Sequence, residues 1–148
     1  EILQISDGSF YPCRNLKKVE IHPDSKLQII GKSAFKACPF SFFFIPHCVE
    51  RICKKAFKSC VNLYTIQVPP ASNLQIIEKD AFCGSSIKFI YLPRHVKQIC
   101  EGAFSLCKEL VKVEIAPNSE ILIIEKNVFA GSPVEKAFPP RIKKIMKK

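Results

Sequence analysis

The hydrophobic positions of this chain recur in a fixed order. A small or apolar residue followed by Phe returns along the chain, with Ile four residues before the small residue and another small residue three positions after the Phe. Intervals of 25 and 22 residues alternate between the Ile positions, which are Ile5, Ile30, Ile52, Ile77, Ile99 and Ile124. Internal periods of this length predict a solenoid, in which each copy fills an equivalent place in a stack.

A second apolar segment follows each Phe and has the pattern apolar-x-x-apolar-x-apolar. Five clear copies span residues 16–21, 40–45, 63–68, 87–92 and 110–115, and a shortened sixth spans 134–139. Their alternation and their Val, Ile and Phe content predict short strands that end near Pro. Equivalent strands should stack in parallel, about 4.8 Å apart. The stretch around each Ala-Phe pair, such as KKAFKSC at 54–60, is expected to form a helical turn or short helix with its Phe pointing inward.

The repeated unit I-x-x-x-A-F-x-x-C-x-x-L-x-x-I-x-I-P, found at 52–69 and 99–117, resembles the BspA-type leucine-rich repeat. Its Cys-rich form with Lys-rich loops is more similar to the protist members than to the bacterial ones. The resemblance covers essentially the whole chain and implies an α/β repeat. The fold implied is a right-handed leucine-rich-repeat solenoid of about six coils of alternating 22 and 25 residues, with a parallel sheet on its concave face and short helical turns opposite. It also implies surface or secreted proteins linked to adhesion and host contact.

The domain organisation follows from length and from the ends of the chain. At 148 residues the chain has the size of a single domain. Residues 1–148 are therefore expected to form one leucine-rich-repeat solenoid, as a segment of a longer array because no capping unit is evident. No run of 18 apolar residues occurs, so no membrane span is predicted.

The strand pattern also predicts a candidate binding face. The residues between the inward positions of stacked strands become neighbours on one surface. Aromatics over the middle strands with basic neighbours are typical of binding surfaces. Two other interpretations remain: aromatics suit exposed strands in general, and a flanking segment of a longer protein could cover them. The candidate ligand-binding residues are Phe42, Phe44, Tyr64, Phe89, Tyr91, Lys17, Lys18, Lys88 and Lys112.

The charge narrows the class of partner. The net charge is +10, from 23 basic and 13 acidic residues. This favours anionic glycans, anionic cell surfaces or nucleic acid as partners, or a merely solubilising surface. Nucleic acid is only weakly indicated, since no recognised binding motif is present. Two basic groups stand out: Arg141, Lys143, Lys144, Lys147 and Lys148 at the C-terminus, and Lys32, Lys36, Lys54, Lys55 and Lys58 on the turn side of two adjacent coils.

The eight cysteines follow the repeat rather than a metal-binding spacing. Cys13, Cys38, Cys60 and Cys107 share one column, in which Ser85 and Ser132 replace Cys, and Cys53 and Cys100 share another. We expect reduced thiols that line the core, with a Cys38–Cys60 bridge as an alternative. The cluster His47, Cys48, Cys53 and Cys60 has no C-x-x-C pair, so no metal site and no cofactor are predicted.

Catalytic motifs are missing from the sequence. It contains no G-x-S-x-G, phosphate loop or H-E-x-x-H, and its three histidines lie in the Pro turns, so an enzyme is not predicted. The first hypothesis is a non-enzymatic protein-binding module for cell-surface adhesion or for contact with a host cell or matrix, acting through the concave sheet face. The second hypothesis is an intracellular, cytoplasmic structural or scaffold protein that docks in a larger assembly; reduced cysteines and missing glycosylation sequons fit it at least as well.

Overall fold

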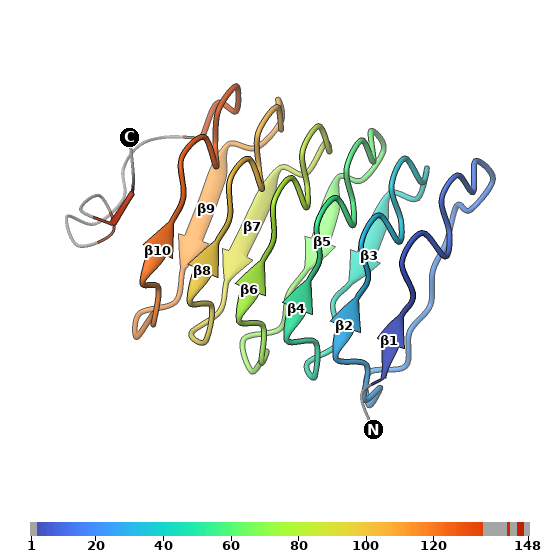
Figure 1. The fold of residues 1–148 in the computed structure, drawn as a ribbon, viewed down its shortest axis with the longest axis horizontal. Helices are drawn as coiled ribbons and strands as arrows, with labels where there is room; N and C mark the ends of the chain where they lie inside the picture. Colours follow the sequence, from blue (N-terminus) through green and yellow to red (C-terminus); the bar gives the residue numbers. More distant parts are fainter. Residues whose placement is uncertain (1–2, 135–141, 143–144, 147–148) are drawn as a thin grey trace.

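The backbone winds into a parallel β-solenoid of about five turns (Figure 1). The computed structural model describes residues 3–134, Ile142, Ile145 and Met146. The longest sheet has six strands, each of two residues and each contributed by a successive pass of the chain. In spatial order these are β1 (Gln4–Ile5), β2 (Ile29–Ile30), β4 (Arg51–Ile52), β6 (Ile76–Ile77), β8 (Gln98–Ile99) and β10 (Ile123–Ile124).

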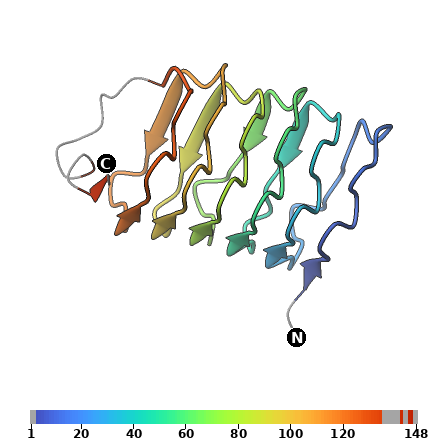
Figure 2. The same cartoon turned by 45° about the horizontal axis from the view of Figure 1, so that its top comes forward.

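The remaining four strands form two separate parallel pairs on another side of the coils (Figure 2). β3 (Phe42–Phe44) pairs with β5 (Thr65–Gln67), and β7 (Phe89–Leu92) pairs with β9 (Lys112–Ile115). These are the strands that alternation predicted, and their parallel stacking is confirmed within each pair.

Two details of the predicted sheet are wrong. The predicted strands do not form one sheet, because no ladder joins β5 to β7 and residues 16–21 form no strand. The continuous sheet belongs instead to the recurring Ile positions, where Ile5 pairs with Ile30 and Ile30 pairs with Ile52. Of the sixth predicted segment only Val134 lies among the described residues.

The predicted helical turns are also wrong, since residues 3–134 contain no helix. In the Ala-Phe stretches, N–H groups that bond three residues back alternate with N–H groups that bond to the next coil. The Phe57 N–H donates to the Ala81 carbonyl at 2.7 Å, where a helix would need the carbonyl four residues earlier. Lys55 and Ser59 flank this point at φ of 61° and 60°, in the left-handed region that interrupts a helix.

Two columns of the repeat form part of the core, beside the inward side chains of the short strands such as Phe43 and Ile90. Ile30, Ile52, Ile77 and Ile99 are fully buried beneath the long sheet. Beside them runs a stack of six Phe rings, with neighbouring centroids 5.0 to 5.7 Å apart and nearly parallel planes. Stacked rings at this spacing add to the stabilisation from apolar burial. The rings are Phe10, Phe35, Phe57, Phe82, Phe104 and Phe129.

The small-residue column has a second role besides its size. Its thiol or hydroxyl groups donate hydrogen bonds to the carbonyl of the stacked Phe in the preceding coil. This explains why Ser132 can replace Cys in the column, since both side chains can donate. The pairs are Cys38 to Phe10 at 3.2 Å, Cys60 to Phe35 at 3.1 Å, Cys107 to Phe82 at 3.1 Å and Ser132 to Phe104 at 2.6 Å. The Ser85 hydroxyl differs, since it lies 3.5 Å from the Cys107 Sγ.

The cysteines are all within the described part of the chain, and each is a free thiol. Four of them are buried, namely Cys38, Cys60, Cys83 and Cys107. The expected core-lining position is therefore confirmed for three of the four cysteines of the small-residue column, Cys38, Cys60 and Cys107. Cys13, at the first coil, is half-buried. No group of three or more His, Cys, Asp or Glu side chains among the described residues is placed to hold a metal ion.

Candidate functional site: an aromatic and basic face

The short strands present the five predicted aromatic side chains on one face. We call Phe42, Phe44, Tyr64, Phe89 and Tyr91 the aromatic face. Each strand alternates, so that in β3 the Phe43 side chain is buried while those of Phe42 and Phe44 point outward. These residues were expected on the main sheet, whereas they lie on and beside the two short sheets, β3 with β5 and β7 with β9.

Three of these side chains are markedly open to solvent. Phe42 and Tyr64 are each 44% exposed and Phe89 is 39% exposed, while Phe44 and Tyr91 are half-buried. The inward neighbours in β5 and β7 are buried, so the aromatic side chains stand on a packed core. A monomeric protein seldom leaves several large aromatic rings exposed together without a use for them.

Two of the predicted lysines lie over rings of this face. The Lys88 Nζ lies 5.6 Å from the Tyr64 ring centroid, and the Lys112 Nζ lies 5.8 Å from that of Phe89. Attraction between a cation and the ring face stabilises such pairs by about 0.5–1 kcal/mol at exposed sites. Each pair therefore offers a partner one apolar surface and one positive charge close together.

The other two predicted lysines differ in how available their charges are. The Lys18 ammonium lies 2.6 Å from a Glu20 carboxylate oxygen, and both side chains are exposed. The hydrogen bond to Glu20 raises the pKa of Lys18, and the same bond lowers the pKa of Glu20. This exposed pair offsets part of the Lys18 charge, whereas Lys17 has no ion-pair partner among the described residues.

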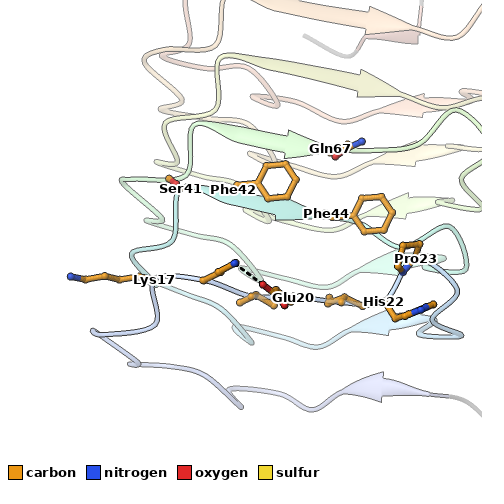
Figure 3. Close-up of a pocket in the computed structure, with 11 residues that line it drawn as sticks. Lys17, Glu20, His22, Pro23, Ser41, Phe42, Phe44 and Gln67 are labelled. Carbon is orange, nitrogen blue, oxygen red and sulfur yellow. Dashed lines mark ion pairs between the residues drawn. The ribbon is translucent and has the colours of Figure 1, made fainter.

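An open groove of about 1040 Å³ lies at the first-coil end of the aromatic face (Figure 3). Residues 17–23 form one wall, and Phe42 and Phe44 of β3 form the other. The groove brings Lys17 and Lys18 together with Phe42 and Phe44, all of them predicted site residues. It also includes residues that sequence analysis missed, namely Val19, Glu20, Ile21, His22, Pro23, Ser41 and Gln67.

The long sheet carries a smaller hollow of about 330 Å³. Arg51 and Glu78 form a 2.7 Å ion pair in its wall, and the hydrogen bond to Glu78 raises the pKa of Arg51. The lining also includes Lys54, Lys79 and Glu125, so this smaller hollow presents charges of both signs to a ligand.

Four of the five lysines predicted on the turn side of the coils lie close enough together to affect one another. The repulsion of Lys58 and Lys54 lowers the pKa of Lys55, and Lys36 adds to this effect. The Lys36 Nζ lies 5.0 Å from the Tyr11 ring centroid. The predicted basic residues at the C-terminus, 141, 143, 144, 147 and 148, lie outside the described residues.

Three solved structures are similar to this chain. One is a leucine-rich repeat protein from Bacteroides ovatus ATCC 8483, with a TM-score of 0.78 and 28% identity over 90% of this chain and 33% of that one. A second is a leucine rich cell surface protein from Faecalibacterium prausnitzii A2-165, with a TM-score of 0.59 and 25% identity over 79% of this chain and 37% of that one. The third is the pneumococcal vaccine antigen PcpA, with a TM-score of 0.68 and 24% identity over 89% of this chain and 33% of that one, which shows a shared fold. The chain thus spans about a third of the length of these proteins.

Comparison with families agrees with the fold. No curated protein matches the chain. The family described as "BspA type Leucine rich repeat region" matches in six copies, over residues 1–111 and 28–148. This is a family of repeat scaffolds, in agreement with the stacked coils of this chain. The chain belongs to the BspA-type leucine-rich repeat family.

Proposed function

We propose that this chain is a non-enzymatic protein-binding module that uses its aromatic face for adhesion at a cell surface, to a protein of a host cell or matrix. The observation that carries the proposal is the exposure of Phe42, Tyr64 and Phe89 on strands whose inward side chains are buried. Aromatic residues fixed on a rigid surface bind a partner with little loss of conformational entropy.

Two further observations support this function. The name of the Faecalibacterium neighbour describes a cell surface protein, which favours a surface location for this chain. Lys88 and Lys112 lie over the rings that would contact the partner, so an acidic surface would be steered to the same place.

The described residues include no helix long and apolar enough to cross a membrane.

The test is binding of the fluorescently labelled chain to a decellularised extracellular matrix, with Phe89→Ala as the first variant. Loss of a central aromatic anchor should weaken binding at least about tenfold. Leu106→Ala is the matched control, because Leu106 is 54% exposed but lies in a turn away from the aromatic face. Equal binding by both variants would show that the aromatic face is not the binding surface.

Two treatments of the matrix identify the class of ligand. Protease treatment should abolish binding if the ligand is a protein. Soluble sulfated polysaccharide should compete only if the ligand is an anionic glycan, which the lysine cluster around Lys55 could also bind.

The eight free thiols favour a second candidate function, an intracellular scaffold. Unpaired cysteines are typical of reducing compartments. Antibody labelling of intact and permeabilised cells of the native organism distinguishes the two. Labelling of intact cells supports adhesion, whereas labelling only after permeabilisation supports the scaffold.

A further inference from the structure

The groove exposes one edge of β3. The Thr65 N–H donates to the Ser41 carbonyl at 3.2 Å, and the Ile45 N–H donates to the Gln67 carbonyl at 2.9 Å. Backbone groups of alternate residues in a strand point to opposite neighbours. The N–H and C=O groups of Phe42 and Phe44 therefore point away from β5, toward the groove.

Among the described residues, those backbone groups have no hydrogen-bond partner on the other side. Within residues 3–134, no backbone hydrogen bond joins residues 17–21 to β3. Val19 and Ile21 line the opposite wall of the groove instead of pairing with the strand. Figure 3 shows residues 17–22 running alongside β3, with Phe42 and Phe44 above them.

The other break in the short ladders is different. Between β5 and β7 the Lys88 N–H still donates to the Tyr64 carbonyl at 3.2 Å, which holds those strands side by side. Neither of the two hollows described above lies at that break. An open strand edge combined with an adjoining groove therefore occurs at β3.

We propose that this groove binds an extended acidic peptide segment of a partner protein by adding it as a further strand to the free edge of β3. The inference rests on the proposed protein-binding function and specifies its mode of binding and the chemistry of its partner. The main chain of the peptide would pair with Phe42 and Phe44, as in known cases of strand addition. The alternate side chains of the peptide would lie against the two Phe rings.

The acidic character of the partner follows from the charges at the groove. Lys17 lines it and has no ion-pair partner among the described residues, whereas Lys18 is already paired with Glu20. The chain as a whole carries a net charge of +10. A carboxylate of the peptide placed beside Lys17 would meet a positive charge that no described residue pairs with.

A methylated peptide series tests the main-chain pairing. The probe is a fluorescein-labelled acidic peptide of about eight residues, alternating valine with glutamate, which extends to roughly 26 Å. One version is N-methylated at the odd residues and another at the even residues. Fluorescence polarisation should show a loss of at least about tenfold for one version, because only one edge faces β3 and each lost hydrogen bond weakens binding. The other version should stay within about threefold of the parent. Equal affinity of both, or no binding of the parent peptide at about 1 mM, overturns strand addition.

Variants of the protein test the location. Phe42→Ala and Lys17→Glu should each weaken binding of the parent peptide by about fivefold or more. Lys108→Glu is the matched control, since it makes the same change of charge at an exposed lysine outside the groove. Equal effects of Lys17→Glu and Lys108→Glu would show that the peptide is attracted by net charge alone. The groove would then not be the binding site.

The results separate this inference from the proposed function. Matrix binding that depends on Phe89, together with a peptide that shows no methylation asymmetry, would refute strand addition and leave the aromatic face intact. Asymmetric peptide binding without any matrix binding would support strand addition and refute adhesion to the matrix.

Discussion

The buried thiol of Cys60 should make the stability of this protein depend on alkaline pH. Its side chain is fully buried, and its Sγ lies 3.1 Å from the Phe35 carbonyl oxygen that accepts its hydrogen bond. Burial raises the pKa of Cys60 from 9.0 to about 12. The folded protein therefore keeps this proton at pH values where the unfolded chain releases it.

The sign and size of the effect follow from proton linkage. Between pH 8 and pH 10 the unfolded thiol, with a pKa near 9.0, changes from largely protonated to largely ionised. The unfolded state then binds fewer protons than the folded state, so the free energy of unfolding falls as pH rises. One thiol removes about 1.4 kcal/mol over this interval, and the loss continues until pH reaches the folded pKa of about 12.

Cys60→Ser isolates this contribution. A serine hydroxyl can keep the hydrogen bond, as Ser132 does toward Phe104 at 2.6 Å, but it does not titrate in this range. The assay is urea unfolding followed by far-UV circular dichroism, since the chain has no Trp, under reducing conditions and at constant ionic strength. From pH 8 to pH 10 the wild-type protein should lose about 1.4 kcal/mol more than the variant.

A second buried thiol provides an internal check. Burial also raises the pKa of Cys107, to about 11, and its Sγ donates to the Phe82 carbonyl at 3.1 Å. Cys107→Ser should therefore reduce the pH dependence by a similar amount, and the double variant by about twice as much, because the two sites lie in different coils. Parallel losses of stability in the wild type and the variants would refute the reasoning.

Two further predictions concern packing. Phe57→Ala should cost about 3–5 kcal/mol of unfolding free energy, because the Phe57 ring is fully buried in the middle of the stack. Phe10→Ala, at the 37% exposed end of the stack, should cost clearly less, and equal losses in urea unfolding would contradict a continuous core. Gly31→Ala should lower stability by about 1–3 kcal/mol, because an added Cβ would meet the Ile5 carbonyl oxygen and would lie 2.8 Å from the Asp7 nitrogen. An unchanged thermal midpoint would show that the first two coils can move apart there at no cost.

Much of the core could be predicted from the sequence because the repeat fixes it. Ile and Phe recur at the repeat positions of Ile52 and Phe57, and these positions form the buried columns of the structure. The long sheet could not be predicted in the same way. Each coil contributes only two residues to it, such as Ile76–Ile77, and a pair this short leaves no alternation to detect.

The turns show why local propensity failed. Ala, Lys and Phe in KKAFKSC are compatible with a helical turn, and nothing in the segment marks a left-handed residue. Lys55 and Ser59 adopt positive φ, and their N–H groups, like that of Phe57, bond to carbonyl groups of the next coil. The stack, rather than the segment, therefore decides the conformation.

The candidate site was predictable in its side chains but not in its shape. Alternation along β3 and β7 was enough to place Phe42 and Phe89 outside the core. The Lys18–Glu20 ion pair could also have been predicted, because residues two apart in an extended segment share a face. No pattern in the sequence predicts the groove, because it is formed where residues 17–21 do not pair with β3.

The groove is supported by contacts that remain intact around it. β1 still pairs with β2 through Gln4–Ile29 and Ile5–Ile30 on the long sheet. Phe10 stacks on Phe35 at 5.0 Å with planes 1° apart, which is the closest spacing in the stack. The first coil is thus held to the second through the long sheet and through the core, while its residues 17–21 do not pair with β3. A groove bounded in this way is formed before a ligand arrives, so an added strand would bind without the cost of opening the solenoid.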